Sequence, residues 1–161
     1  MSLTLAKLLG TVLIGGKTIP IIRTIGMNFI IKTITTTTTS ICNLIQYISE
    51  RYATKDIIET LKSIDIDYSV NIIEQLVAEQ EKDETPISVK MALVGVNEIL
   101  DDIHVELNKI KETIDYHESK WFSKWRTFDC SNHVSLIKSY KIKLDRRYKK
   151  LIELLQIYHK K

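Results

Sequence analysis

The sequence predicts an all-α protein, an up-and-down helical bundle dominated by a long antiparallel helical hairpin at its C-terminal end. Two long segments carry apolar residues at alternating steps of three and four, the spacing that lines one side of a helix. The regions that contain these two segments also differ in charge. Residues 51–118 hold 7 bases and 16 acids, and residues 119–161 hold 12 bases and 3 acids. Folding the second segment back on the first brings opposite charges together.

The composition is that of one globular domain, with 44% apolar and 27% charged residues in a chain of 161. Its two cysteines, Cys42 and Cys130, provide no disulfide framework and are typical of a reducing, intracellular compartment. The formal net charge is only +3, because the acidic middle and the basic end nearly cancel. This internal pairing explains the basic end, so nucleic acid is disfavoured as a partner.

The first third of the chain is its most apolar part. We divide the chain into an apolar N-terminal segment, residues 1–52, and a helical bundle domain, residues 53–161. Neither half of the apolar run reaches the roughly 20 residues needed to span a bilayer, and no secretory cleavage pattern follows it. Three interpretations stay open: a buried core helix, a membrane-interfacial or inserting segment, and a spanning helix pair. The candidate membrane- or partner-facing residues are Leu8, Leu9, Val12, Leu13, Ile14, Ile21, Ile22, Ile25, Phe29 and Ile30.

A helix is predicted from about Ile21 to Tyr52, although six threonines crowd positions 33–39 and β-branched residues disfavour helix. The prediction depends on a row of apolar residues seven apart, namely Met27, Ile34, Ile41 and Ile48. A β-strand through the threonines is the competing interpretation.

Two shorter helices are expected next. Thr54 can cap the first, which begins at Lys55, and either Asp67 or Ser69 opens the second. Residues 80–85, QEKDET, read as a polar linker.

The central helix is predicted from Pro86 to about Phe122, after a Thr85–Pro86 start signal. At about 1.5 Å per residue it is roughly 55 Å long, and its apolar side needs cover. One row of that side holds Val89, Val96, Ile103, Ile110 and His117, and the other holds Leu93, Leu100, Leu107, Ile114 and Trp121.

A last helix follows the turn residues at 129–132 and presents Ile137, Leu144, Leu151 and Tyr158 in one row, beside Tyr140 or Lys141, Tyr148 and Leu155. A fold about residue 127 would bring Leu144 near Lys111, Leu151 near His104 and Tyr158 near Asn97. In that register Asp101, Asp102 and Glu106 face Lys149, Lys150 and Arg146.

Two surfaces are candidates for binding. An aromatic–basic cluster holds Lys120, Trp121, Phe122, Lys124, Trp125 and Arg126, and it either plugs the end of the bundle or contacts a partner or lipid headgroups. A basic face on the last helix holds Lys141, Arg146, Arg147, Lys149 and Lys150. It either pairs with the chain's own acids or binds an acidic partner or anionic lipid.

Signals of catalysis, cofactor or metal binding are weak. The stretch GTVLIGGKT at 10–18 lacks the first glycine of a phosphate-binding loop. Cys130, His133 and His117 are too few for a structural zinc site, and Asp101 with His104 lacks the paired motif of a di-iron bundle. We therefore expect no catalytic, cofactor or metal residues.

The helix order resembles a known family. Two short helices lead to SVKMALVGVNEILDDIHVELNKIKETI, then to the break KWFSKWR and a last helix VSLIKSYKIKLDRRYKKLIELL. Over about residues 41–158 this layout is similar to the N-terminal four-helix bundle of mixed-lineage-kinase-like pseudokinases and related HeLo-type cell-death domains. The resemblance implies oligomerisation and membrane permeabilisation, with residues 3–31 as the inserting element. The threonine run departs from that pattern.

The sequence therefore predicts a non-enzymatic interaction protein that assembles with itself or other chains as a structural or assembly component. The alternative is a membrane-associating, oligomerising effector that inserts its apolar N-terminal segment into an anionic membrane.

Overall fold

A computed structural model describes residues 11–14, 17–20, 26–51, 55–79, 85–120 and 129–159. These residues are mostly helical, so the predicted all-α class is confirmed. The elements are β1 (Thr11–Ile14), β2 (Lys17–Pro20), α2 (Met27–Ser49), α3 (Lys55–Ser63), α4 (Ile66–Ala78), α5 (Ile87–Glu118) and α6 (Ser131–His159). The two short strands pair antiparallel, with Thr11 opposite Pro20 and Ile14 opposite Lys17, and the sequence analysis did not predict them.

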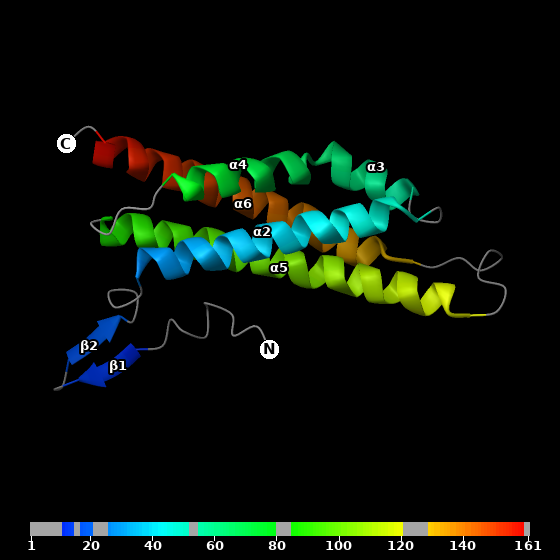
Figure 1. Cartoon of the computed structure of the whole chain (residues 1–161), viewed down its shortest axis with the longest axis horizontal. Coiled ribbons are helices and arrows are strands. Elements are labelled where there is room, and N and C mark those ends of the chain that lie inside the picture. Colours follow the sequence, from blue (N-terminus) through cyan, green and yellow to red (C-terminus); the bar gives the residue numbers. More distant parts are fainter. Residues whose placement is uncertain are drawn as a thin grey trace.

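Four units alternate in direction along the chain, namely α2, the α3–α4 arm, α5 and α6, and they form an elongated bundle (Figure 1). α5 packs against α2 and α6, while α4 covers α2 and α3 touches α6. The neighbouring helices α2 and α5 run in the same direction. Two hydrogen bonds show this: Thr37 bonds to Asp101 and Ser40 bonds to His104, and each pair is separated by the same 64 positions in the sequence. α5 and α6 form the antiparallel hairpin that the sequence predicts.

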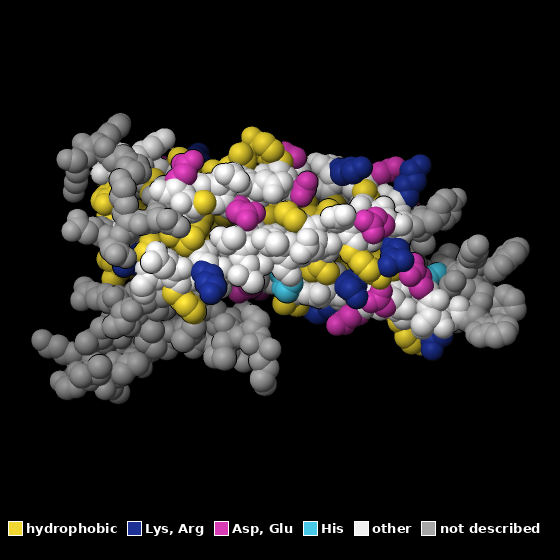
Figure 2. Space-filling model, in the orientation of Figure 1, with side chains coloured by type: hydrophobic (Ala, Val, Ile, Leu, Met, Phe, Trp, Pro, Cys, Tyr) yellow, Lys and Arg dark blue, Asp and Glu magenta, His cyan; other side chains and the backbone are white. Residues whose placement is uncertain are grey.

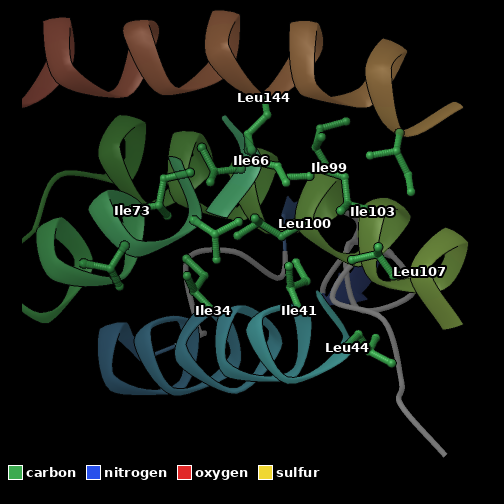
Figure 3. Close-up of a cluster of buried hydrophobic side chains, with 14 of the residues drawn as sticks. Ile34, Ile41, Leu44, Ile66, Ile73, Ile99, Leu100, Ile103, Leu107 and Leu144 are labelled. Atoms are coloured by element: carbon green, nitrogen blue, oxygen red, sulfur yellow. The ribbon is translucent and has the colours of Figure 1, made fainter. Parts of the chain in front are cut away.

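The apolar side of α5 is the centre of the core. Its first row is buried from Val89 to Ile110, and its second row is buried from Leu93 to Ile114. Figure 3 shows side chains of α2 and α5 meeting in this core, with Leu100 and Ile103 among them and Leu144 of α6 pointing towards it. The helix ends at Glu118, a few residues before the predicted end.

α2 confirms the helix interpretation of the threonine run. Met27, Ile34, Ile41 and Ile48 are all buried, so tertiary packing outweighs the low propensity of threonine. The hydroxyls of Thr33 and Thr36 donate to the carbonyls four residues earlier, and that of Thr38 donates to the carbonyl of Thr35.

The packing of α2 moves the expected domain boundary. Residues 27–49 share the core of α4 and α5, so they belong with the bundle and not with a separate segment that ends at residue 52. Ile30 is fully buried in this core, which corrects its assignment to a partner- or membrane-facing surface.

α3 and α4 form one bent arm. α3 begins at Lys55 as predicted, and α4 begins at Ile66, just before the two predicted start residues. The bend lies at Asp65, whose φ of 55° is in the left-handed region. A side chain there is strained, and aspartate is among the few residues other than glycine that adopt this conformation.

The register of the α5–α6 hairpin differs from the prediction. Arg147 bonds to the Gly95 carbonyl and to Glu98, and His133 bonds to Glu106. α6 is therefore displaced along α5 by about two heptads from the predicted register. A slip of whole heptads keeps the same apolar positions facing each other, so apolar spacing alone does not distinguish the two registers.

The predicted charge pairs change with the register. Asp101 receives a bond from Thr37, Glu106 bonds to Lys109 and His133, and Lys150 pairs with Glu153 of its own helix. Opposite charge still joins the hairpin through Arg147 and Glu98, whose side chains are 2.7 Å apart.

Candidate functional site: the outer surfaces of α5 and α6

Large apolar side chains are exposed mainly on α5 and α6. Among the described residues, nine large hydrophobic side chains are exposed, and seven of them lie on these two helices. The other two are Phe29 on α2 and Tyr68 on α4. The seven are Ile87, Met91, Val105, Tyr116, Leu136, Ile142 and Ile157.

On the outer side of α5, two of the exposed apolar residues lie on one heptad row, which we call the α5 stripe: Met91, Glu98, Val105 and Glu112. Apolar and acidic residues alternate along it. Met91 is 55% exposed and Val105 is 46% exposed, and the Glu98 side chain bonds to Arg147. The α5 stripe therefore holds two uncovered apolar side chains, one glutamate that pairs with Arg147 and a second glutamate, Glu112, that is exposed.

On α6 a second heptad row, the α6 stripe, holds Leu136, Lys143, Lys150 and Ile157. Leu136 is 42% exposed and Ile157 is 60% exposed. The ammonium of Lys143 lies 5.3 Å from the ring centre of Tyr140, and Lys150 pairs with Glu153 at 3.1 Å. Exposed charges of this kind stay accessible to a partner, because surface ion pairs are weak.

The predicted basic face divides into two groups. Lys141 is largely buried and bonds to both carboxylate oxygens of Asp145 at 2.7 Å, and Arg147 is held by α5. Arg146 and Lys149 are exposed, as is Lys150. The basic face is thus smaller than the sequence suggested, because two of its members are used inside the bundle.

The other two predicted surfaces fall largely outside the described residues. Of the aromatic–basic cluster only Lys120 is described, and its ammonium lies 4.3 Å from the ring centre of Tyr116. Of the N-terminal candidates, Val12, Leu13 and Ile14 lie in β1, and Phe29 is exposed. The remaining members of both sets lie outside the described residues, namely Leu8, Leu9, Ile21, Ile22, Ile25, Trp121, Phe122, Lys124, Trp125 and Arg126.

Beside the apolar core, α5 also makes polar contacts with α2, and we call this line of residues the polar side of α5. The sequence analysis missed these contacts. Thr37 donates to Asp101 at 3.1 Å, and Asn97 donates to the second oxygen of the same carboxylate at 3.1 Å. Asn97 is fully buried, and its own side-chain oxygen has no partner in the described part of the chain. Burial raises the pKa of Asp101 despite these two hydrogen bonds.

A second polar contact lies one turn further along. His104 Nε2 is 2.8 Å from Ser40 Oγ and 3.1 Å from Asn108 Nδ2. Because the amide nitrogen of Asn108 can only donate, Nε2 is the acceptor in this contact and the imidazole is neutral. Burial lowers the pKa of His104, which agrees with the neutral form, and nearby Asp101 opposes this shift.

A third contact joins the far ends of α2 and α5. The hydroxyl of Tyr47 donates to Asp115, which also pairs with Lys111. These donors lower the pKa of Asp115, with Lys111 the larger cause.

Figure 2 shows few charged side chains over the middle of α2, while charged ones gather towards one end of the bundle.

One cysteine lies in the wall of a surface groove. A groove of about 780 Å³ lies between α2 and the α3–α4 bend and contains Cys42. Burial and nearby Asp67 raise the pKa of Cys42 to about 11, so its thiol is protonated at neutral pH and is a poor nucleophile. The described residues contain no group of three or more His, Cys, Asp or Glu side chains that could hold a metal ion.

None of the described helices combines the length and the apolar character that crossing a bilayer requires.

Comparison with known proteins gives one relative. The chain is 24% identical to "Uncharacterized protein L717" of Acanthamoeba polyphaga mimivirus, and the match covers 78% of this chain and 74% of that protein. No protein-family model matches the chain. No solved structure matches it either.

Proposed function

We propose that the protein is a non-enzymatic helical bundle that assembles with itself or with other chains, as a structural or assembly component. The observation that carries this proposal is the concentration of exposed apolar side chains on the outer surfaces of α5 and α6. Single exposed apolar residues are common on protein surfaces and need no explanation, but residues that recur along one helix line form a surface that a partner can cover.

The core of the bundle does not need these residues. Both inner rows of α5 are already covered by the chain itself, as are Ile137, Leu144 and Leu151 of α6. The outer apolar side chains therefore add little to folding of the monomer, and their burial in an interface would favour assembly because it removes apolar surface from water.

Size-exclusion chromatography with light scattering, run with and without a mild detergent, tests the proposal. The monomer has a mass of 18.6 kDa, and we expect a larger species in detergent-free buffer. The proposal is contradicted if the protein is a monodisperse monomer in both buffers and also forms no complex with another protein chain.

A second candidate is a membrane-associating, oligomerising effector, as the family resemblance implies. It is supported by Lys138, Arg146 and Lys149, which are exposed on α6 within two turns of the exposed Ile142. A basic surface with an apolar centre suits an anionic membrane, and stable attachment needs a second element such as the apolar N-terminal segment.

Flotation with anionic liposomes tests the second candidate. Because Met27 and Ile30 are buried in the core, the deletion variant should remove residues 1–25 only and leave α2 intact. The effector function predicts flotation of the full chain and its loss in the deletion variant. Equal flotation of both, or of neither, contradicts insertion of the N-terminal segment.

A further inference from the structure

The α5 and α6 stripes match each other in length and are opposite in charge. Each spans 22 residues, or about 31 Å of helix, and each carries two apolar and two charged side chains at heptad spacing. The charges of the α5 stripe are both acidic, and those of the α6 stripe are both basic. We propose that the α5 stripe of one copy binds the α6 stripe of a second copy, an inference that rests on the proposed self-assembly.

Charge is the first argument for a second copy as the occupant. An anionic membrane or a nucleic acid would attract the α6 stripe but repel the α5 stripe, which would leave Met91 and Val105 uncovered. Another copy of this chain offers both signs at once. The same preference already operates inside the molecule, where Arg147 of α6 pairs with Glu98 of α5 at 2.7 Å.

Symmetry is the second argument. α5 and α6 are neighbours, so one two-fold axis can place each stripe against the opposite stripe of the partner and make both contacts together. Two strips about 30 Å long and about 10 Å wide give each copy a footprint of about 600 Å². This is somewhat below the area of a standard interface, about 800 Å² per partner, so we expect a reversible, concentration-dependent dimer.

Charge reversal with mixing tests this pairing. The α5 variant carries Val105→Lys and Glu112→Lys, and the α6 variant carries Lys143→Glu and Lys150→Glu. A matched control, Lys32→Glu with Lys62→Glu, makes the same change in net charge as the α6 variant at exposed positions of α2 and α3. Circular dichroism and thermal unfolding verify that every variant folds, and sedimentation velocity measures association.

We expect the wild type and the control to associate, and each stripe variant alone to associate at least tenfold more weakly. Mixing the two variants should restore association towards the wild-type level, because acid again faces base in both contacts. If the wild type associates and the stripe variants associate equally well, the pairing of the stripes is wrong while self-assembly stands.

If the wild type is a monomer at every concentration, self-assembly and the pairing both fail. If it is a monomer that floats with anionic liposomes, and Lys143→Glu with Lys150→Glu abolishes flotation, the α6 stripe binds membrane and the inference is likewise overturned.

Discussion

α5 carries two sets of heptad-spaced residues on nearly opposite sides, and the sets differ in what covers them. The inner rows are continuous runs of leucine, isoleucine and valine, buried by the chain itself from Val89 to Ile114. The outer row alternates apolar residues with glutamates, and all of its members except Glu98, which pairs with Arg147, are exposed. An uninterrupted apolar row is stable when the chain itself buries it, whereas a row interrupted by glutamates is compatible with exposure to water.

The largest expected effect is a cavity in the inner row. Leu100→Ala should lower the free energy of unfolding by about 2–5 kcal/mol, because Leu100 is fully buried between helices. Urea denaturation followed by circular dichroism measures the change. Met91→Ala on the outer row is the control and should change the unfolding free energy by less than about 0.5 kcal/mol. Equal effects of the two substitutions would remove the distinction between the rows.

A smaller effect is expected on the polar side of α5. Asp101→Ala deprives the Thr37 hydroxyl and the buried Asn97 amide of their acceptor, at a cost of about 1–3 kcal/mol. Asp102 is the next residue along the helix and is exposed, so Asp102→Ala is the control. An unfolding free energy that falls no further for Asp101→Ala than for Asp102→Ala would show that the α2–α5 contact adds no stability.

The pH dependence of stability gives a third test. The pKa of His104 is lower in the folded protein than in the unfolded chain, so the unfolded state binds the proton first as the pH falls below about 6.5. Stability should therefore decrease with acidification through this range. Asp101 acts in the opposite direction closer to pH 4, because its pKa is raised. His104→Asn should flatten the profile of unfolding free energy between pH 7.5 and 5.5, and an unchanged slope in the variant would assign the dependence elsewhere.

The surface bond across the hairpin should matter least among the internal contacts. Arg147→Ala removes its bonds to Glu98 and to the Gly95 carbonyl, and because both side chains are partly exposed the loss should be about 0.2–1 kcal/mol. Thermal unfolding compared with Lys149→Ala measures it. A loss above about 2 kcal/mol would mean that this bond, and not the apolar packing, holds the register.

The inner rows show how much of the fold was predictable. Apolar spacing predicted α5, α6, their antiparallel packing and the helical threonine run, because each depends on burial along one helix side. The prediction of the hairpin register was wrong, because a displacement of one helix by whole heptads leaves the apolar spacing unchanged. The hydrogen bonds between α2 and α5 depend on Thr37, Ser40 and Tyr47, which only the three-dimensional packing brings to Asp101, His104 and Asp115.

The candidate surface was only partly predictable. The sequence analysis identified the basic residues of α6 but not which of them the bundle itself uses, since that depends on the register. It did not select Met91, Val105, Leu136 or Ile157, although their heptad spacing with glutamates and lysines was visible. Exposure is what separates these residues from core residues, and exposure requires the packed structure.

Sedimentation velocity of the wild type beside a Val105→Ser, Ile157→Ser variant tests the central claim most directly. Both substitutions remove an exposed apolar side chain and leave the inner rows untouched. We predict that the wild type sediments faster as its concentration rises, while the folded variant remains an 18.6-kDa monomer throughout. A variant that sediments like the wild type, associated or not, would contradict the assignment of assembly to the outer surfaces of α5 and α6.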